Sequence, residues 1–356
     1  MNSNWMIYGA YGYTGELISR LAVERGMQPI LAGRNEARTQ ELAESLGLSW
    51  RSFSLEDNED IKAGLANCKL VLHCAGPFSA TSAPMLSACL EVGAHYLDIT
   101  GEIDVFAAAH KHHEQARKKD IVILPGAGFD VVPTDCLAAT LVQKLPSATH
   151  LTLAFEAGGG PSTGTAKSAI EGMGKGGRIR KDGKLTTVPL AWKTRQIPFV
   201  EGERLGMTIP WGDVFTSYIS TGIPNVEVFL SVPPAAVKRM RGMRKFKWLL
   251  GLDPVQSFLK SRIENKVSGP DTTLRGNTQA RVWGEVRSSD GRSVSGQVNA
   301  PNGYTLTADA ALGISAYLME HHPEGGFYTP SLLMGADYVT SLQGVEMKIA
   351  DIISNE

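Results

Sequence analysis

The segment that follows the first hydrophobic run of the chain reads Gly9-Ala10-Tyr11-Gly12-Tyr13-Thr14-Gly15. It lies between a predicted strand, residues 4–9, and a predicted helix, residues 15–25. In this context the first glycine permits a tight turn, the second lets a phosphate approach the backbone, and the third allows close packing of helix on strand. The N–H groups and dipole of the helix N-terminus attract an anion. We therefore predict a dinucleotide-binding loop formed by Gly9, Tyr11, Gly12, Tyr13, Thr14 and Gly15; the alternative is a glycine-rich turn without a ligand.

The same alternation of strand and helix continues to about residue 131. Further strands are predicted at residues 28–33, 69–74, 95–99 and 121–124, and further helices at residues 35–46, 82–92 and 105–118. Short strands rich in valine, isoleucine and leucine, each followed by a helix, are typical of a parallel sheet covered on both faces. Right-handed crossovers then predict a Rossmann doubly wound domain.

The pattern changes after a predicted helix at residues 132–145. Apolar and polar residues alternate at residues 150–156, 188–197, 226–232, 279–286 and 293–300, which favours a mixed or antiparallel sheet. A helix at residues 308–319, capped by Thr307, precedes a glycine-rich tail. The predicted fold class is α/β, with an inserted second α+β domain. We expect residues 1–131 and a C-terminal return, about 304–356, to form the nucleotide domain, and residues 132–303 to form a substrate and oligomerisation domain.

The end of the second strand indicates which dinucleotide binds. It reads Gly33-Arg34-Asn35, where an enzyme that prefers NAD usually carries an acidic residue for the ribose hydroxyls. The guanidinium of Arg34 pairs with a 2′-phosphate and stacks on adenine, whereas a carboxylate there would repel the phosphate. Gly33, Arg34 and Asn35 therefore predict NADP as the cofactor. The alternative is an exposed arginine at the start of a solvated helix.

Several further motifs carry a resemblance to a known family. They are Ala-Gly-Arg-Asn at 32–35, Cys-Ala-Gly-Pro-Phe at 74–78, His-Tyr-Leu-Asp-Ile-Thr-Gly-Glu at 95–102 and Gly-Ala-Gly-Phe-Asp-Val-Val-Pro-Thr-Asp at 126–135. Together with the glycine loop they resemble the saccharopine dehydrogenase-like oxidoreductases, a family that includes the trans-acting enoyl reductases. The resemblance implies an NADP-binding Rossmann domain, a homodimer, and hydride transfer to an enoyl C=C or an imine C=N bond.

The carboxyl ends of neighbouring strands are expected to meet at one crevice. The residues expected to border the cofactor there are Cys74, Ala75, Gly76, Pro77, Phe78 and Thr100. Glu102 and Asp130 are the predicted catalytic carboxyl groups; the alternative for each is a helix cap or a structural role. For Cys74 the alternative is a buried thiol that packs as a small apolar group.

A second glycine-rich loop, residues 158–165, precedes Lys167. Its N–H groups and Lys167 are suited to an anionic substrate group, so Lys167 is the third predicted catalytic residue. The alternative is a surface loop. No metal site is expected, because the histidines at 110, 112 and 113 fall on a lysine-rich, solvated helix.

The overall composition limits the partners. The 356 residues contain 35 Lys and Arg and 36 Asp and Glu, so no global charge attracts nucleic acid. Four irregularly spaced cysteines and the lack of a signal peptide favour a cytoplasmic protein. The basic run that begins at residue 238 is either a solvated amphipathic helix or a peripheral membrane contact through residues 238–250.

These observations favour one function over a second. We expect an NADP-dependent oxidoreductase that acts on a small-molecule substrate, which is either a hydrophobic acyl or carrier-bound compound or an imine. The alternative is an NADP(H)-binding redox sensor without turnover, because similar glycine loops occur in such regulators.

Overall fold

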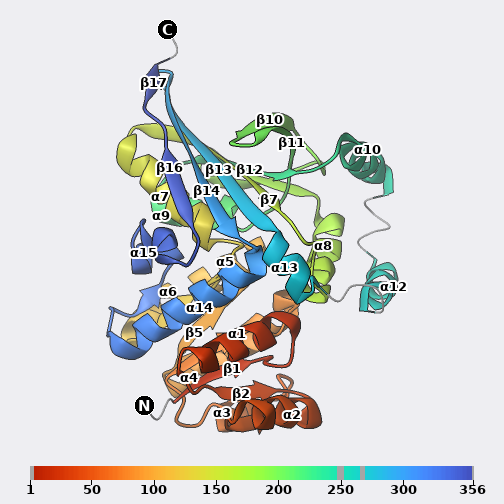
Figure 1. Cartoon of the computed structure of the whole chain (residues 1–356), viewed down its shortest axis with the longest axis vertical. Helices are drawn as coiled ribbons and strands as arrows, with labels where there is room; N and C mark the ends of the chain where they lie inside the picture. The colour runs from red at the N-terminus through yellow and green to blue at the C-terminus, as the bar shows by residue number, and fades with distance from the viewer. Residues whose placement is uncertain (1–3, 247–251, 265–268, 355–356) are drawn as a thin grey trace. The chain divides into compact units, whose positions relative to one another are not determined.

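The computed structural model describes residues 4–246, 252–264 and 269–354 (Figure 1). The chain divides into two compact units. The first unit comprises Met1–Val132 and Tyr304–Met334, and the second comprises Pro133–Gly303 and Gly335–Glu356.

The first unit contains a seven-stranded sheet with the order β15-β6-β5-β4-β1-β2-β3. Every neighbouring pair of strands is parallel. The strands are β1 (Trp5–Tyr8), β2 (Ile30–Gly33), β3 (Trp50–Ser52), β4 (Leu70–His73), β5 (His95–Asp98), β6 (Val122–Leu124) and β15 (Gly326–Phe327). β1 and β4 are buried along their whole length, which explains why both read as unbroken apolar runs. The predicted Rossmann fold is confirmed.

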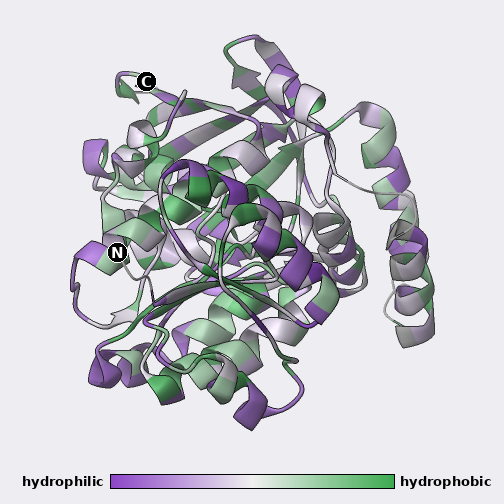
Figure 2. Cartoon of the chain, turned by 60° about the horizontal axis from the view of Figure 1, so that its bottom comes forward, coloured by the Kyte–Doolittle hydropathy of each residue, from purple (hydrophilic) through white to green (hydrophobic). Residues whose placement is uncertain are grey.

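Helices connect these strands. They are α1 (Tyr13–Glu24), α2 (Glu36–Leu46), α3 (Asn58–Gly64), α4 (Phe78–Val92), α5 (Ile103–His110), α6 (His113–Lys119), α14 (Gly303–Glu320) and α15 (Pro330–Met334). Right-handed crossovers place α1 and α2 on one face of the sheet, and α3, α4 and α5 on the other. In Figure 2 hydrophilic and hydrophobic stretches alternate along the helices, as expected where one side of a helix packs on a sheet.

The strand order places the functional loops. β1 and β4 are neighbours, although β2 and β3 lie between them in the sequence. The connections from β1 and β4 therefore run in opposite directions across the sheet. This is the topological switch point at which open α/β sheets bind ligands, beyond the carboxyl ends of the strands.

The second unit contains a ten-stranded sheet with the main order β10-β11-β12-β7-β13-β14-β16. β7 and β12 pair in parallel and the other pairs are antiparallel, so the sheet is mixed, as predicted. The strands are β7 (Ala148–Ala157), β8 (Gly177–Lys181), β9 (Lys184–Val188), β10 (Thr194–Phe199), β11 (Gly202–Thr208), β12 (Asn225–Ser231), β13 (Gln279–Ser288), β14 (Arg292–Pro301), β16 (Glu346–Ile349) and β17 (Ile353–Ser354). The accompanying helices are α7 (Val132–Lys144), α8 (Thr163–Lys175), α9 (Asp213–Thr221), α10 (Pro234–Met243), η1 (Arg244–Phe246), α12 (Asp253–Glu264), α13 (Thr272–Asn277) and α16 (Tyr338–Ser341).

The C-terminal segment continues this second sheet. β16 and β17 both pair with β14, so residues 335–356 group with the second unit. This segment is predicted from the sequence to return to the nucleotide domain, and the pairing of its strands with β14 explains the difference. Within the described residues, none of the helices combines the length and hydrophobicity that a bilayer crossing requires.

Two predicted helices differ from the structure in their bounds. The helix predicted at 105–118 is interrupted after His110, and the second piece, α6, begins at His113, whose Nδ1 accepts a hydrogen bond from the N–H of Phe327 at 3.0 Å. The helix predicted to begin after Thr307 begins at Gly303 instead. Thr307 does not cap it, because its hydroxyl oxygen accepts a hydrogen bond from the N–H of Phe129 at 3.0 Å.

The strand predicted at 188–197 is divided by a turn. Ala191 has a φ of 52°, which interrupts the extended backbone between β9 and β10. Arg244 donates to the carbonyl oxygens of Leu190 and Ala191 at 2.6 and 2.7 Å, and Arg241 donates to that of Ala191 at 3.3 Å. Part of the predicted basic run therefore holds this turn.

Candidate functional site

The predicted phosphate loop leads from β1 into α1. Gly9 has a φ of +81°, in the region that favours glycine. The N–H groups of Gly9 and Ala10 both donate to the carbonyl oxygen of Ala32, at 2.7 and 3.1 Å, so the loop is fixed to β2. A Cβ atom at Gly9 would lie 2.7 Å from the backbone nitrogen of Ala75, which shows that the loop also packs directly on the segment after β4.

The start of α1 approaches this loop closely. A Cβ atom at Gly15 would lie 2.2 Å from the carbonyl oxygen of Gly9, a separation that no side chain tolerates. The N–H of Gly12 donates to the same oxygen at 3.0 Å. Gly12 is the N-cap residue and has no side chain with which to cap the helix, whereas the side chain of Asn35 caps α2. The positive end of the α1 dipole therefore lies at a glycine turn with no Cβ at Gly12 or Gly15, the backbone that a pyrophosphate-binding loop requires.

The end of β2 adds an aromatic and basic surface to the loop. A Cβ atom at Gly33 would lie 2.5 Å from the ring of Tyr11, so only glycine accommodates this ring. The hydroxyl oxygen of Tyr11 accepts a hydrogen bond from the N–H of Asn35 at 3.3 Å. Arg34 follows directly and is exposed. These contacts place Tyr11 and Arg34 at the junction of the first and second strand ends.

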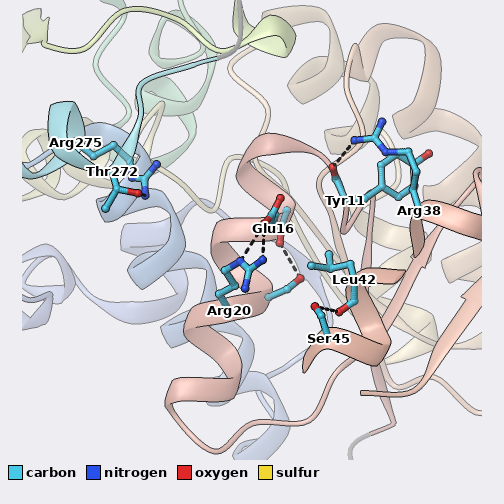
Figure 3. A network of polar contacts seen from close by, with 10 residues as sticks. Tyr11, Glu16, Arg20, Arg38, Leu42, Ser45, Thr272 and Arg275 are labelled. Atoms are coloured by element: carbon cyan, nitrogen blue, oxygen red, sulfur yellow. Dashed lines mark hydrogen bonds and ion pairs between the residues drawn. The ribbon is translucent and has the colours of Figure 1, made fainter. Parts of the chain in front are cut away.

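Arg38 is a further residue of this surface, which the sequence analysis does not identify. Its guanidinium carbon lies 4.7 Å from the centre of the Tyr11 ring, and its Nη2 donates to the carbonyl oxygen of Tyr11 at 3.4 Å (Figure 3). Arg38 lies four residues after Arg34, in the first turns of α2. The spacing of two arginines four residues apart, next to a glycine loop, is the sequence pattern that identifies Arg38 as part of this surface.

The turn after β4 contains the predicted residues Cys74, Ala75, Gly76, Pro77 and Phe78. Cys74 continues the sheet, because its N–H donates to the carbonyl oxygen of Tyr8 at 2.7 Å. Burial raises the pKa of the Cys74 thiol well above its usual range, so the side chain is an uncharged thiol at neutral pH. Phe78 begins α4 and is buried.

Glu102 lies across this turn. Its Oε1 accepts a hydrogen bond from the N–H of Phe78 at 3.2 Å, and its Oε2 accepts one from the N–H of Ser79 at 3.0 Å. The carboxylate thus caps α4 from another element. Thr100 supports it, because its hydroxyl oxygen accepts a hydrogen bond from the N–H of Glu102 at 3.1 Å.

Asp98, at the end of β5, holds the adjoining loops together. It accepts hydrogen bonds from the hydroxyl of Tyr96 at 2.7 Å and from the N–H groups of Thr100 and Gly126, both at 2.9 Å. Burial raises the pKa of Asp98 to about 6, although these hydrogen bonds favour the charged form. Asp98 is therefore a structural carboxylate beneath the site.

Asp130 follows the loop after β6 and packs against Gly101. A Cβ atom at Gly101 would lie 2.8 Å from Oδ2 of Asp130. Burial raises the pKa of Asp130 to about 7, and the negative charge of Glu102 adds to the increase. Asp130 and Glu102, two of the three predicted catalytic groups, thus lie close together in the first unit. Of these two, Asp130 has the pKa of a group that exchanges a proton near neutral pH.

A buried histidine lies beneath the same turn. Nε2 of His73 lies 3.0 Å from the hydroxyl oxygen of Thr81, and its buried Nδ1 has no hydrogen-bond partner among the described residues. Burial lowers the pKa of His73 to about 3, so the ring is neutral in the folded protein.

This histidine predicts a pH-dependent contribution to stability. His73 takes up a proton near pH 6.5 in the unfolded chain but only near pH 3 in the folded chain. The contribution of the neutral ring to the unfolding free energy is therefore complete above pH 6.5 and decreases as the pH falls towards 3. At pH 4 the loss is roughly 3 kcal/mol. We expect His73→Gln, which keeps a polar group near Thr81 but does not titrate, to gain unfolding free energy relative to the wild type as the pH falls from 7 to 4.

The wild type and His73→Gln must be compared with each other by urea unfolding at each pH. Asp98 and Asp130 change the unfolding free energy with pH in the opposite direction to His73, so the wild type alone does not show the effect of His73. Their raised pKa values mean that the folded protein takes up protons first, so their unfavourable contributions disappear on acidification. A constant difference between wild type and His73→Gln at every pH would contradict the prediction.

The third predicted catalytic residue, Lys167, lies on α8 of the second unit. Ser162 caps this helix, and its hydroxyl oxygen accepts a hydrogen bond from the N–H of Thr165 at 3.3 Å. The structure therefore does not place Lys167 in the same unit as Glu102 and Asp130. Of the basic segment 238–250, residues 247–250 lie outside the described part of the chain.

Comparisons with known proteins identify the proteins that this chain resembles. Residues 5–124 match the family described as the saccharopine dehydrogenase NADP binding domain. A saccharopine dehydrogenase-like oxidoreductase of Mus musculus is 30% identical over 202 residues, which cover 49% of this chain and 47% of the relative. A trans-acting enoyl reductase of Mycobacterium leprae is 31% identical over 149 residues, which cover 39% of this chain and 35% of the relative. The matches thus span about half, or less, of each relative's length.

A solved structure shows the same fold over the whole chain. Apo saccharopine dehydrogenase (L-Glu forming) from Saccharomyces cerevisiae superposes with a TM-score of 0.66 at 11% identity, and the match covers 98% of this chain and 100% of that chain. The resemblance predicted from the sequence is confirmed: the chain is similar to saccharopine dehydrogenase-like oxidoreductases, and its residues 5–124 match the saccharopine dehydrogenase NADP-binding domain.

Proposed function

We propose that this protein is an NADP-dependent oxidoreductase that transfers a hydride to a C=C or C=N bond. The observation that carries the proposal is the glycine turn between β1 and α1, where Gly15 packs against the carbonyl oxygen of Gly9, within residues that match an NADP-binding domain. The loop at 9–15 would hold the pyrophosphate, and Arg34 and Arg38 would hold the 2′-phosphate. NADPH, when bound, supplies the hydride.

We assign the proton transfer to Asp130. Reduction of a C=C bond adds a proton as well as a hydride, and a carboxyl group with a pKa of about 7 is protonated in a large fraction of the molecules near neutral pH, where an ordinary carboxyl group is ionised. Lys167 is proposed to bind an anionic group of the substrate. The second unit as a whole is proposed to bind substrate and to form the homodimer.

The role of Asp130 predicts a specific kinetic result. Asp130→Asn keeps the size of the side chain but removes the proton donor, so turnover is expected to fall by about 100-fold or more while NADPH affinity stays unchanged. Because the wild type needs a protonated Asp130, its turnover is expected to decrease as the pH rises through about 7. Loss of NADPH affinity in the variant, with turnover of the remaining complex unchanged, would contradict the assignment.

The substrate class follows from the relatives only as a proposal. A relative named trans-acting enoyl reductase favours a hydrophobic acyl group, free or bound to a carrier, and relatives named saccharopine dehydrogenase-like favour an imine. The cysteines of the described residues are free thiols, which fits the proposed cytoplasmic location. A membrane contact through residues 238–250 is supported only by their basic charge, part of which holds the turn at Ala191.

The test is NADPH oxidation by the purified protein. We would add α,β-unsaturated acyl thioesters, carried by coenzyme A or by an acyl carrier protein, and in separate assays the imines formed from an amino acid and an oxo acid. Oxidation of NADPH with one of these classes supports the proposal and identifies the bond reduced. Tight NADPH binding without oxidation in any assay would favour the alternative, a redox sensor, which the oxidoreductase relatives do not favour.

A further inference from the structure

The turn between β4 and α4 forms one wall of the phosphate loop. Ala75 is the residue that Gly9 contacts, because a Cβ atom at Gly9 would lie 2.7 Å from its backbone nitrogen and 2.8 Å from its Cβ. A shift of this turn therefore moves the loop that precedes α1. What holds the turn in place also determines the shape of the cofactor site.

Thr81 holds the carbonyl side of the turn. Its Oγ1 lies 2.6 Å from the carbonyl oxygen of Ala75 and 3.1 Å from that of Pro77. The buried ring of His73 lies on the other side of the same hydroxyl, with Nε2 at 3.0 Å. A His73 that donates from Nε2 leaves the Thr81 hydroxyl hydrogen for these carbonyl oxygens.

Glu102 holds the amide side. Pro77, the N-cap residue of α4, has no capping hydrogen bond from its own side chain. Both carboxylate oxygens of Glu102 fill that position, through the N–H groups of Phe78 and Ser79. The backbone of Glu102 meanwhile begins α5, because its carbonyl oxygen accepts hydrogen bonds from Val105 and Phe106 at 3.0 and 3.2 Å. One residue thus joins the starts of two helices at the switch point.

We propose that Glu102 is a positioning residue, which fixes the turn at 75–78 against the phosphate loop and occupies the N-terminus of α4 so that the cofactor anion binds at α1. The inference rests on the proposed function only where NADPH affinity is used to test it. A carboxylate suits the position because it accepts both hydrogen bonds and its charge complements the helix dipole. The predicted catalytic role of Glu102 is replaced by this one, since its carboxylate oxygens are engaged with the helix.

The first readout is hydrogen exchange at the amides of Phe78 and Ser79 in the full-length protein. Glu102→Ala removes both acceptors, so these amides are expected to exchange at least about tenfold faster than in the wild type. Glu102→Gln keeps one acceptor oxygen, so one of the two amides is expected to remain protected. Formate added to Glu102→Ala is expected to restore protection, because it places a carboxylate at the vacated helix N-terminus.

The second readout is NADPH affinity, measured by fluorescence titration of the same proteins. We expect about tenfold weaker binding by Glu102→Ala, an intermediate value for Glu102→Gln, and recovery of the alanine variant with formate. Asp57→Ala is the matched control: Asp57 is also a carboxylate cap, of α3, through the N–H groups of Glu59 and Asp60. It is expected to lower stability without changing NADPH affinity.

The two readouts separate the inference from the proposed function. Unchanged exchange at Phe78 and Ser79 in Glu102→Ala would overturn the capping role, whatever the protein binds. Faster exchange with unchanged NADPH affinity would overturn the link between the turn and the cofactor. If the wild type binds no NADPH, the proposed function fails, and the exchange data with formate still decide whether Glu102 holds the turn.

Discussion

Gly15→Ala is expected to weaken NADPH binding by about 100-fold or more. The added Cβ would lie 2.2 Å from the carbonyl oxygen of Gly9 and 3.0 Å from Cα of Ala10, and both neighbours are backbone atoms that cannot rotate away. Either α1 or the phosphate loop must move, which removes the N–H groups of the helix from the pyrophosphate. Fluorescence titration with NADPH measures the effect.

A second helical glycine supplies the control. A Cβ atom at Gly172, in α8, would meet no other atom within 4 Å. Since alanine favours a helix over glycine by about 1 kcal/mol, Gly172→Ala is expected to stabilise the protein slightly and to leave NADPH affinity unchanged. NADPH binding by Gly15→Ala that equals that of Gly172→Ala would show that the close approach of α1 is not needed for the cofactor.

Arg34→Asp is expected to reverse the preference between the two nicotinamide cofactors. The change removes a charge-assisted contact with the 2′-phosphate and introduces repulsion, so we expect NADPH affinity to fall by about 100-fold. NADH lacks that phosphate, and its affinity is expected to change by less than about threefold. Arg38→Ala is expected to act in the same direction, with a smaller effect because part of its guanidinium contact is with Tyr11.

The control for Arg34 is another exposed arginine of the first unit. Arg20 pairs with Glu16 on α1, with 2.8 Å between Nη2 and Oε1, and this pair contributes little to stability (Figure 3). Arg20→Ala is expected to bind NADPH and NADH as the wild type does. Parallel losses of NADPH and NADH affinity in Arg34→Asp would mean that Arg34 supports the loop rather than reading the 2′-phosphate.

The parts of the fold that the sequence predicts best are those with a strong local signal. β1 and β4 are buried on all sides, so their hydrophobic runs are unbroken and easily recognised. The phosphate loop is predictable because each glycine is needed for a local reason, which the positive φ of Gly9 and the close approach at Gly15 now explain. By contrast, β3 is a short strand at the sheet edge and α3 follows it in a polar stretch, and neither is predicted from the sequence.

The residues that sequence reasoning interprets less well act across long separations in the chain. Glu102 caps a helix that begins 24 residues earlier, and no local sequence pattern predicts such a contact. The break at Ala191 depends on arginines about 50 residues later. Such partners become visible only when the fold brings the segments together.

The central claim is that the loop at 9–15 and Arg34 form an NADP(H) site, and titration of the wild-type protein with NADPH and NADH tests it most directly. We expect NADPH to bind at least about tenfold more tightly than NADH, and adenosine 2′,5′-bisphosphate to compete with it, because one charge-assisted phosphate contact contributes at least that factor. Equal affinities for the two cofactors, or no binding of either, would contradict the account.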